Sequence, residues 1–323
     1  MLGSLLKFSL GRIVLSIPLL LSVIVITFLL IHAAPGDPAV LLAGDAPAPE
    51  FLAQIRYAYN LDKPVWQQLL IYIIKAAQLD FGSSIYFKRP VIDVIVERLP
   101  ATLLLSGTAM VLASVLGVAL GAWAAQRKGS GTDSIVSGAS LLGYSIPTFW
   151  LGQLLVLLFA VYLPLLPASG MTEVRLRYTG FAHFVDVARH LILPACTLAV
   201  FELALIARFT RTAMIDALGR DYIVVAFAKG GRKRHVVWRH AFPNAVIVSI
   251  TIIGLEFGAL LAGAVVTETV FSWPGIGRLF YDAVFRRDFT LLSGLFIFAS
   301  LAVILVNLVT DILCSLLDPR IVR

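Results

Sequence analysis

Long apolar runs alternate with shorter polar segments along most of the chain. Six of these runs are long enough to cross a hydrocarbon core of about 30 Å, and they cover residues 13–31, 99–125, 135–162, 190–207, 245–270 and 291–317. The third run is interrupted by Pro147. The pattern predicts an all-α, polytopic membrane protein with six transmembrane helices.

The first apolar run has two interpretations. Ala33 and Ala34 follow it closely, as small residues do at the cleavage site of a signal peptide. The run is longer than the usual apolar core of a signal peptide, which favours a retained first span.

The composition agrees with a membrane protein. Of 323 residues, 59% are hydrophobic and only 14% are charged, which excludes an ordinary soluble enzyme. Cys196 and Cys314 both fall in apolar runs, so no disulfide framework is predicted. The net charge is +7, but no basic run with interleaved aromatic residues lies on a soluble domain, so nucleic-acid binding is disfavoured.

The segment between the first two spans is mixed in character. Its stretch 65–79 is amphipathic and too polar to span, which predicts a surface helix at the membrane interface. We therefore divide the chain into an N-terminal tail with the first span (1–34), an extracytoplasmic cap (35–98), a transmembrane core (99–317) that contains the loop 212–244, and a C-terminal tail (318–323).

Two pairs of glycines lie four residues apart inside spans. They are Gly117 with Gly121 and Gly254 with Gly258. Such pairs let neighbouring helices approach closely, so we expect helix-packing surfaces at both places.

The basic residues are distributed unequally between the two sides. With six spans, the termini and the segments 125–133 and 208–240 share one side, which holds fourteen Lys/Arg against four acidic residues. The opposite side holds twelve against eleven. An excess of Lys/Arg marks the cytoplasmic side, so both termini and the loop 212–244 are predicted to be cytoplasmic.

The loop 212–244 has helix and turn signals in addition to the basic charge that orients a membrane protein. Residues 214–229 suit a helix, Gly230 and Gly231 suit its end, and residues 232–242 suit a second helix that meets Pro243 at the next span. Helix, turn and helix predict a shaped docking surface for a partner protein. The alternative is a charged connector that only orients the chain.

The sequence contains none of the catalytic motifs that we considered. There is no phosphate-binding GxxxxGK[ST], no HExxH and no GxSxG. We therefore predict no catalytic, cofactor-binding or metal site on this chain. Glu202, Glu256 and Glu268 are acids in or near spans, and they either line a pathway or form packing contacts. An ion-coupled transporter would have a denser set of polar groups at the membrane centre.

Several short motifs together resemble one family. DYIVVAFAKG (221–230) and RHAFPNA (239–245) resemble the cytoplasmic loop of permeases of ABC importers. The flanking motifs narrow the resemblance to the dipeptide/oligopeptide/nickel permease family, and they are PGDP (35–38), LDFGSS (79–84), LPAT (99–102), SIPTFWLG (145–152), LPASG (166–170), FSWPGIGRL (271–279) and DPR (318–320). They follow one another along nearly the whole chain.

The resemblance implies a type I ABC-importer permease fold and a passive half of a pore in the bacterial inner membrane. It implies four kinds of partner: a homologous second permease, two cytoplasmic ATPases, an external solute-binding protein and the lipid bilayer. ATP and Mg²⁺ would then be bound by the ATPases and no cofactor by this chain. The substrate implied is a di- or oligopeptide, with nickel or a metal chelate as the alternative within the family and an ion-coupled secondary transporter as the alternative outside it.

The resemblance also assigns a role to the helix that ends at Gly230. It would be a coupling helix seated in a groove of one ATPase, with Asp221, Ala226, Ala228, Lys229, Gly230 and Arg232 as its coupling residues. This chain departs from its relatives in two respects. Val224, Val225 and Phe227 stand where polar or basic residues are usual, and Glu202 stands where small apolar residues are usual.

Overall fold

The protein is built from helices. The computed structural model describes residues 2–33, 48–58, 62–173, 175–176 and 178–317. Within these ranges every regular element is helical, apart from one isolated antiparallel bridge between Ser83 and Pro90. Among the described residues, five helices are long and apolar enough to cross a membrane, and six crossings result if one bent helix pair counts as a single span. The predicted fold class is confirmed, whereas the motifs 35–38 and 318–320 and the tail 318–323 lie outside the described residues.

Helices α5 (Val91–Gln126) and α8 (Gly180–Leu218) form the centre of the bundle. They run in the same direction, since Gly117 lies against Ile206 and Gly121 against Thr210. A Cβ atom added to Gly121 would lie 2.4 Å from the carbonyl oxygen of Ala207. The close packing predicted for this glycine pair is therefore confirmed.

Helices α11 (Phe242–Leu261), α14 (Phe289–Leu317) and α1 (Leu2–Ala33) pack on one another in that order. At Gly254 an added Cβ atom would lie 2.0 Å from Oγ1 of Thr310, whereas at Gly258 the nearest atom would be at an ordinary 3.6 Å. Only the first glycine of this pair is therefore required for close packing. Nε of Arg12 on α1 lies 3.1 Å from Oδ2 of Asp311 on α14.

The predicted third span is broken. Helix α6 (Gly131–Ser145) is followed by α7 (Thr148–Val156) and the π-helical turn η1 (Leu157–Tyr162), and the two parts meet at an angle of 95°. Pro147 provides no N–H and disfavours helical angles at the residue before it, and Ile146 has the extended angles φ −74° and ψ 124°. The interruption predicted at Pro147 is confirmed, and it takes the form of a sharp bend between two helical parts.

At three other predicted spans the helix bounds differ from those of the apolar run. Helix α5 begins at Val91 rather than at 99, and α8 extends well beyond 190–207 at both ends. The span predicted for 245–270 ends at Leu261, because the chain turns at Gly263, whose φ is +122°. Residues beyond that turn form the separate helices α12 (Val265–Val270) and α13 (Ile276–Phe285).

The segment between α1 and α5 contains α3 (Pro49–Ala58) and α4 (Val65–Ala77). Helix α4 packs against the end of α1, where the ring of Tyr72 lies 5.7 Å from that of Phe28 and Nε2 of His32 lies 3.1 Å from Oε1 of Gln68. Its opposite face leaves Trp66 exposed. The amphipathic helix predicted for 65–79 is thus present, two residues shorter.

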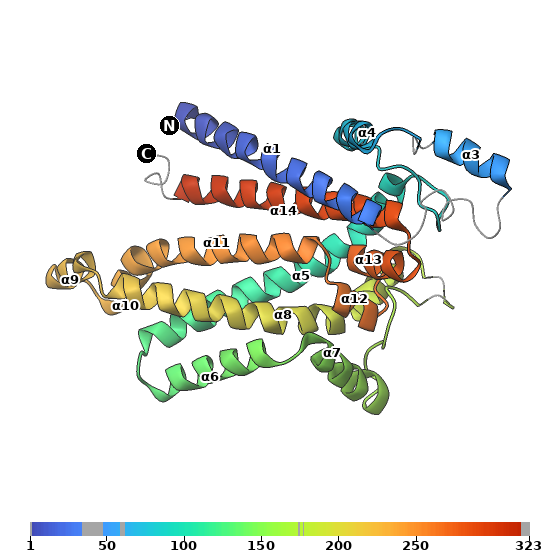
Figure 1. Ribbon diagram of the computed structural model, residues 1–323. Coiled ribbons are helices and arrows are strands. Elements are labelled where there is room, and N and C mark those ends of the chain that lie inside the picture. Colours follow the sequence, from blue (N-terminus) through green and yellow to red (C-terminus); the bar gives the residue numbers. More distant parts are fainter. Residues whose placement is uncertain (1, 34–47, 59–61, 174, 177, 318–323) are drawn as a thin grey trace.

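The bundle has two distinct ends. At one end lie the start of α1, the turn between α5 and α6, the end of α14, and the short helices α9 (Asp221–Ala228) and α10 (Lys233–Val236) (Figure 1). Helices α3, α4, α12 and α13 lie at the other end. The start of α1, the end of α14 and the loop 212–244 therefore lie on the same side of the bundle, as the even number of predicted spans requires.

Candidate functional site

Helix α9 is the short helix at the tip of the loop 212–244. Helix α8 ends at Leu218, and the chain passes through Gly219 and an extended Arg220 before α9 begins at Asp221. The single helix predicted for 214–229 was therefore wrong, since Gly219 separates it into two pieces. The carboxylate of Asp221 stands in the first turn of α9, where the helix dipole favours negative charge.

The end of α9 is a tight turn at two glycines. The amide of Gly231 donates to the carbonyl oxygen of Ala226 at 3.1 Å, and the amide of Gly230 donates to that of Phe227 at 2.9 Å. These two bonds form a Schellman motif, which needs a left-handed residue at its centre, and Gly230 has φ +83°. The helix stop predicted at these glycines is confirmed.

The two faces of α9 differ in exposure. Ile223 is 2% exposed, and Ala226 packs beside it against the same cluster of buried side chains. The other face exposes Val224 (64%), Val225 (50%) and Phe227 (44%). Of the predicted coupling residues, Ala226 thus lies partly against the protein's own core, whereas Asp221, Ala228, Lys229, Gly230 and Arg232 are exposed.

Helix α9 is anchored to the bundle. Val236, Val237 and Ala241 are buried against Met214 of α8 and Ala122 of α5. The second predicted helix, 232–242, consists of α10, a π-helical turn η2 (Val237–Ala241) and the first residue of α11. Pro243 stands in the first turn of α11, as expected. The loop is therefore a fixed structure rather than a slack connector.

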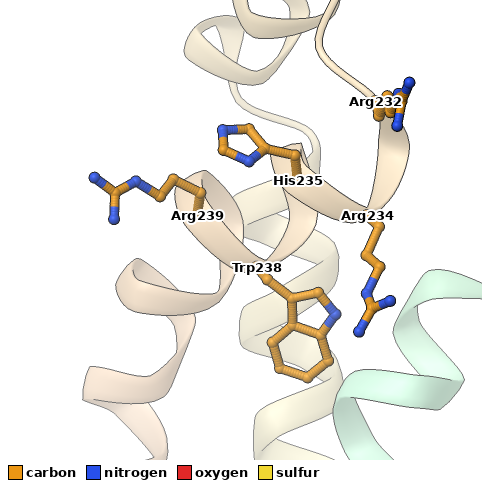
Figure 2. A pocket seen from close by; sticks show the side chains of 5 residues that line it. All are labelled: Arg232, Arg234, His235, Trp238 and Arg239. Carbon is orange, nitrogen blue, oxygen red and sulfur yellow. The ribbon is translucent and has the colours of Figure 1, made fainter.

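A basic pocket lies beside α9. It has a volume of about 610 Å³ and is lined by the residues labelled in Figure 2: Arg232, Arg234, His235, Trp238 and Arg239. Arg234 and Trp238 point in the same direction in Figure 2, whereas His235 and Arg239 point toward the other side. The sequence indicated these charges but not that they line one open pocket.

An ion pair fixes α6 to α8 at the same end of the bundle. The guanidinium of Arg211 donates to both carboxylate oxygens of Asp133, with Nη2 at 2.8 Å from Oδ2, and the amide of Gly129 donates to Oδ2 at 2.9 Å. Bidentate pairs of this kind are geometrically specific. Sequence analysis missed it, because 78 positions separate the partners.

Glu268 is a packing group at the opposite end. Its side chain is completely buried, and its carboxylate accepts hydrogen bonds from Oγ1 of Thr102 at 3.1 Å and from the amide of Arg278 at 2.9 Å. Burial raises the pKa of the Glu268 carboxyl, and hydrogen bonds from Arg278 and Thr102 lower it. Gly275 is required beside it, since an added Cβ atom would lie 2.5 Å from the carboxylate. The carboxylate thus holds the start of α13 against α5.

Glu202 and Glu256 lie on the neighbouring helices α8 and α11. Glu202 is 4% exposed, and its Oε2 has no hydrogen-bond partner among the described residues, while Glu256 is half-buried. Thr210 and Ser249 join the same two helices by a hydrogen bond of 2.8 Å. In the described part of the chain, no group of three or more His, Cys, Asp or Glu side chains is arranged to hold a metal ion.

A second buried carboxylate fixes the cap segment to the core. Asp288 accepts hydrogen bonds from Oγ of Ser84 at 2.5 Å, from the amide of Tyr86 at 3.1 Å and from the amide of Leu291 at 3.0 Å. It therefore joins the chain before α5 to the first turn of α14. Nothing in the sequence pairs these residues, which are 204 positions apart.

Comparison with known proteins identifies the family. Residues 117–323 match the family described as the binding-protein-dependent transport system inner membrane component, and residues 5–106 match the N-terminal part of such membrane components. The chain belongs to this family. The loop 212–244 and the basic pocket both lie within the larger match, and the segment 35–98 lies within the smaller one.

Three curated relatives of this permease are similar over nearly their whole length. The dipeptide transport system permease protein DppB of Escherichia coli (strain K12) is 40% identical over 334 aligned positions, which cover 98% of both chains. The di/tripeptide transport system permease protein DppB of Pseudomonas aeruginosa is 42% identical and covers 98% of both chains. The oligopeptide transport system permease protein AppB of Bacillus subtilis is 37% identical and covers 96% of this chain and 97% of its own.

Family membership confirms the resemblance found in the motifs. As a member of this family the chain is a multi-pass permease of the inner membrane, in agreement with its apolar helices. The motif FSWPGIGRL (271–279) has a structural role. Its residues Phe271, Trp273, Ile276 and Leu279 are buried, and Nε1 of Trp273 donates to the carbonyl oxygen of Ala101 at 2.8 Å.

Proposed function

We propose that this chain is the permease subunit of an ATP-driven, binding-protein-dependent importer of di- and oligopeptides. The peptide substrate rests on the names of the relatives, which are dipeptide, di/tripeptide and oligopeptide permeases matched from end to end. The observation that carries the mechanism is α9, an anchored helix whose exposed face is apolar. An apolar face on a fixed loop is suited to a partner protein.

The proposed partner at α9 is a cytoplasmic ATPase. The exposed Val224, Val225 and Phe227 would enter its groove, and Lys229 at the end of the helix would supply charge at the rim. Because α9 is joined to α8 and α11 through a buried cluster, a displacement of α9 by the ATPase would move both spans. Coupling residues Asp221, Ala228, Gly230 and Arg232 shape the helix ends, while Ala226 supports the helix from inside.

The complete transporter would contain further subunits. A homologous second permease forms the other half of the pathway, two ATPases bind and hydrolyse ATP with Mg²⁺, and an external solute-binding protein delivers the peptide. This chain itself holds no cofactor and catalyses no reaction in the proposal. The side with α9 faces the cytoplasm, in line with its excess of Lys/Arg, and the side with α3 and α4 receives the binding protein.

Glu202 and Glu256 belong to the proposed pathway rather than to a metal site. Carboxylates inside a membrane are costly and are usually retained for function. Glu268, in contrast, is assigned to packing, since its carboxylate accepts two hydrogen bonds from the chain itself.

Uptake into proteoliposomes tests the proposal. The complex of both permeases and both ATPases is reconstituted with its binding protein outside and ATP inside, and accumulation of a labelled dipeptide is measured. We expect uptake that requires both ATP and the binding protein and that unlabelled tripeptide inhibits. Uptake driven by a proton gradient without ATP would contradict the proposal in favour of a secondary transporter, and accumulation of Ni²⁺ but of no peptide would favour the nickel alternative.

A further inference from the structure

The basic pocket beside α9 has no anionic partner within the described part of the chain. Its walls carry the guanidinium groups of Arg232, Arg234 and Arg239, and none of the three forms a hydrogen bond or ion pair with another described side chain. The remaining two lining residues, His235 and Trp238, add no negative charge. We propose that this pocket binds the phosphate group of an anionic phospholipid from the adjacent membrane leaflet.

The chemistry of the pocket suits a phosphate. A guanidinium offers planar, paired N–H donors that match two oxygens of a phosphate, and it is more weakly hydrated than an ammonium group. Three such groups around one volume of about 610 Å³ provide more donors than a single carboxylate accepts. A phosphodiester with its glycerol backbone fits both the donors and the space.

The position of the pocket favours a lipid as the source of that phosphate. All of its residues except Arg232 lie in the first turns of the apolar helix Lys233–Leu261, at one end of this candidate span. The indole of Trp238 is 47% exposed and packs at 4.8 Å on the ring of Phe242, which is the next turn of the span. Half-exposed tryptophans at the end of a span are typical of the headgroup region.

Figure 2 supports this position. Arg234 and Trp238 point in the direction in which the helices of the bundle continue, so the apolar ring and one guanidinium point along the bundle rather than away from it. Arrangements of this kind, in which basic side chains surround a cleft at the end of a span, bind anionic headgroups. The lipid phosphate would lie at Arg234 with its acyl chains beside Trp238, and Arg239 would add positive charge from the other side of the pocket.

The alternative occupant is a carboxylate of the partner ATPase. The exposed apolar face of α9, made by Val224, Val225 and Phe227, is the surface assigned to that partner, and none of these three residues lines the pocket. Arg232 is both a predicted coupling residue and a lining residue of the pocket, so the two surfaces are separated by mutation at Arg234, Trp238 and Arg239 instead. The lipid inference does not depend on the proposed function, because lipid binding is measured on the full chain without its partners.

Lipid binding to the purified full chain tests the inference. Phosphatidylglycerol and phosphatidylcholine are titrated separately in detergent, and bound lipid is counted by native mass spectrometry. We expect the chain to bind phosphatidylglycerol in preference, and the double variant R234Q/R239Q to bind it about tenfold more weakly, because the charge-assisted contact of Arg234 and the positive charge of Arg239 are both lost. The variant Trp238→Leu, which keeps every charge, should also bind it more weakly.

The matched control is R127Q/K128Q, which removes two positive charges from the turn between α5 and α6 at the same end of the bundle. It should bind phosphatidylglycerol as the wild type does. Equal binding by R234Q/R239Q and wild type would overturn the inference, as would an equal loss in the control. Displacement of the lipid by an equal concentration of inorganic phosphate would indicate a site for a soluble anion instead. Unchanged lipid binding with loss of the ATPase from the purified complex would assign the pocket to the ATPase.

Discussion

The amide of Gly231 donates a hydrogen bond to the carbonyl oxygen of Ala226, so that α9 ends in a turn with Gly230 at its left-handed centre. The two glycines are needed for different reasons. A Cβ atom at Gly230 would meet nothing within 4 Å, and only the backbone angle opposes it. A Cβ atom at Gly231 would lie 2.7 Å from the oxygen of Ala226.

Alanine substitution at three glycines separates these effects. We expect Gly230→Ala to destabilise the turn by about 1 kcal/mol through its backbone angle, and Gly231→Ala to disrupt it through the steric clash. Gly219→Ala is the control, since it has a negative φ and its nearest contact would be 3.6 Å. Uptake should fall in the first two variants and stay at the wild-type level in the third. Full uptake by all three variants would mean that the turn is not needed for coupling.

The ion pair between Arg211 and Asp133 leads to a prediction about stability. The side chain of Asp133 is 7% exposed, so Asp133→Asn leaves the charge of Arg211 facing a neutral partner in a fixed position. We expect this variant to lower the unfolding temperature of the purified chain measurably, and Arg211→Lys to lower it less, because a lysine keeps the charge but not the bidentate geometry.

The pair Arg89–Glu97 provides the comparison for that experiment. Both of its side chains are about half exposed, at 53% and 54%. Exposed pairs contribute little to stability, so Glu97→Gln should leave the unfolding temperature unchanged. An equal change in unfolding temperature for Asp133→Asn and Glu97→Gln would contradict a structural role specific to Asp133.

The contact between Gly275 and Glu268 predicts non-additive mutations. Gly275→Ala alone should be strongly destabilising, since its new methyl group would lie 2.5 Å from the carboxylate. Glu268→Ala alone should also destabilise, because Thr102 and the amide of Arg278 lose their acceptor. In the double variant the methyl group meets no carboxylate. The double variant should therefore lose less free energy of unfolding than the sum of the losses of the two single variants. Strict additivity in thermal unfolding would show that the two residues do not interact.

Cysteine labelling tests the orientation of the chain. In a variant whose Cys196 and Cys314 are replaced by alanine, Lys128→Cys lies in the turn between α5 and α6, and Gln78→Cys follows α4 at the other end. Both positions are exposed. We expect a membrane-impermeant maleimide to label residue 78 but not residue 128 in cells with an opened outer membrane. The reverse pattern would place α9 outside the cytoplasm and exclude its coupling role.

The sequence predicted the elements that depend on local chemistry. Length and apolarity located the membrane helices, Pro147 marked the break in the third, and Gly230 marked the end of α9. Helix ends were less accurate, because packing extends α8 and α5 beyond the apolar residues that revealed them. The break at Gly219 was not predicted, since a single glycine is tolerated within many helices.

The polar contacts that fix the fold were not predictable in this way. Thr102 and Glu268 are 166 positions apart, and Ser84 and Asp288 are 204 apart. Neither pair has a spacing that a helical or strand period would reveal, because such contacts arise only when distant helices pack. The same holds for the inward orientation of Ala226, which depends on the cluster of buried side chains beneath α9.

The exposed face of α9 provides the most direct test of the coupling account. Val224→Asp and Phe227→Asp place a charge where we propose an apolar ATPase groove, and burying an unpaired charge costs several kcal/mol. Val224→Thr and Phe227→Tyr nearly keep the size of each side chain without adding charge. Each variant is purified with the second permease, and ATPase co-purification and dipeptide uptake are measured in the same membranes. The account predicts that both aspartate variants pair with the second permease but lose the ATPase and uptake, while the threonine and tyrosine variants retain both. Wild-type ATPase recovery and uptake in the aspartate variants would contradict it.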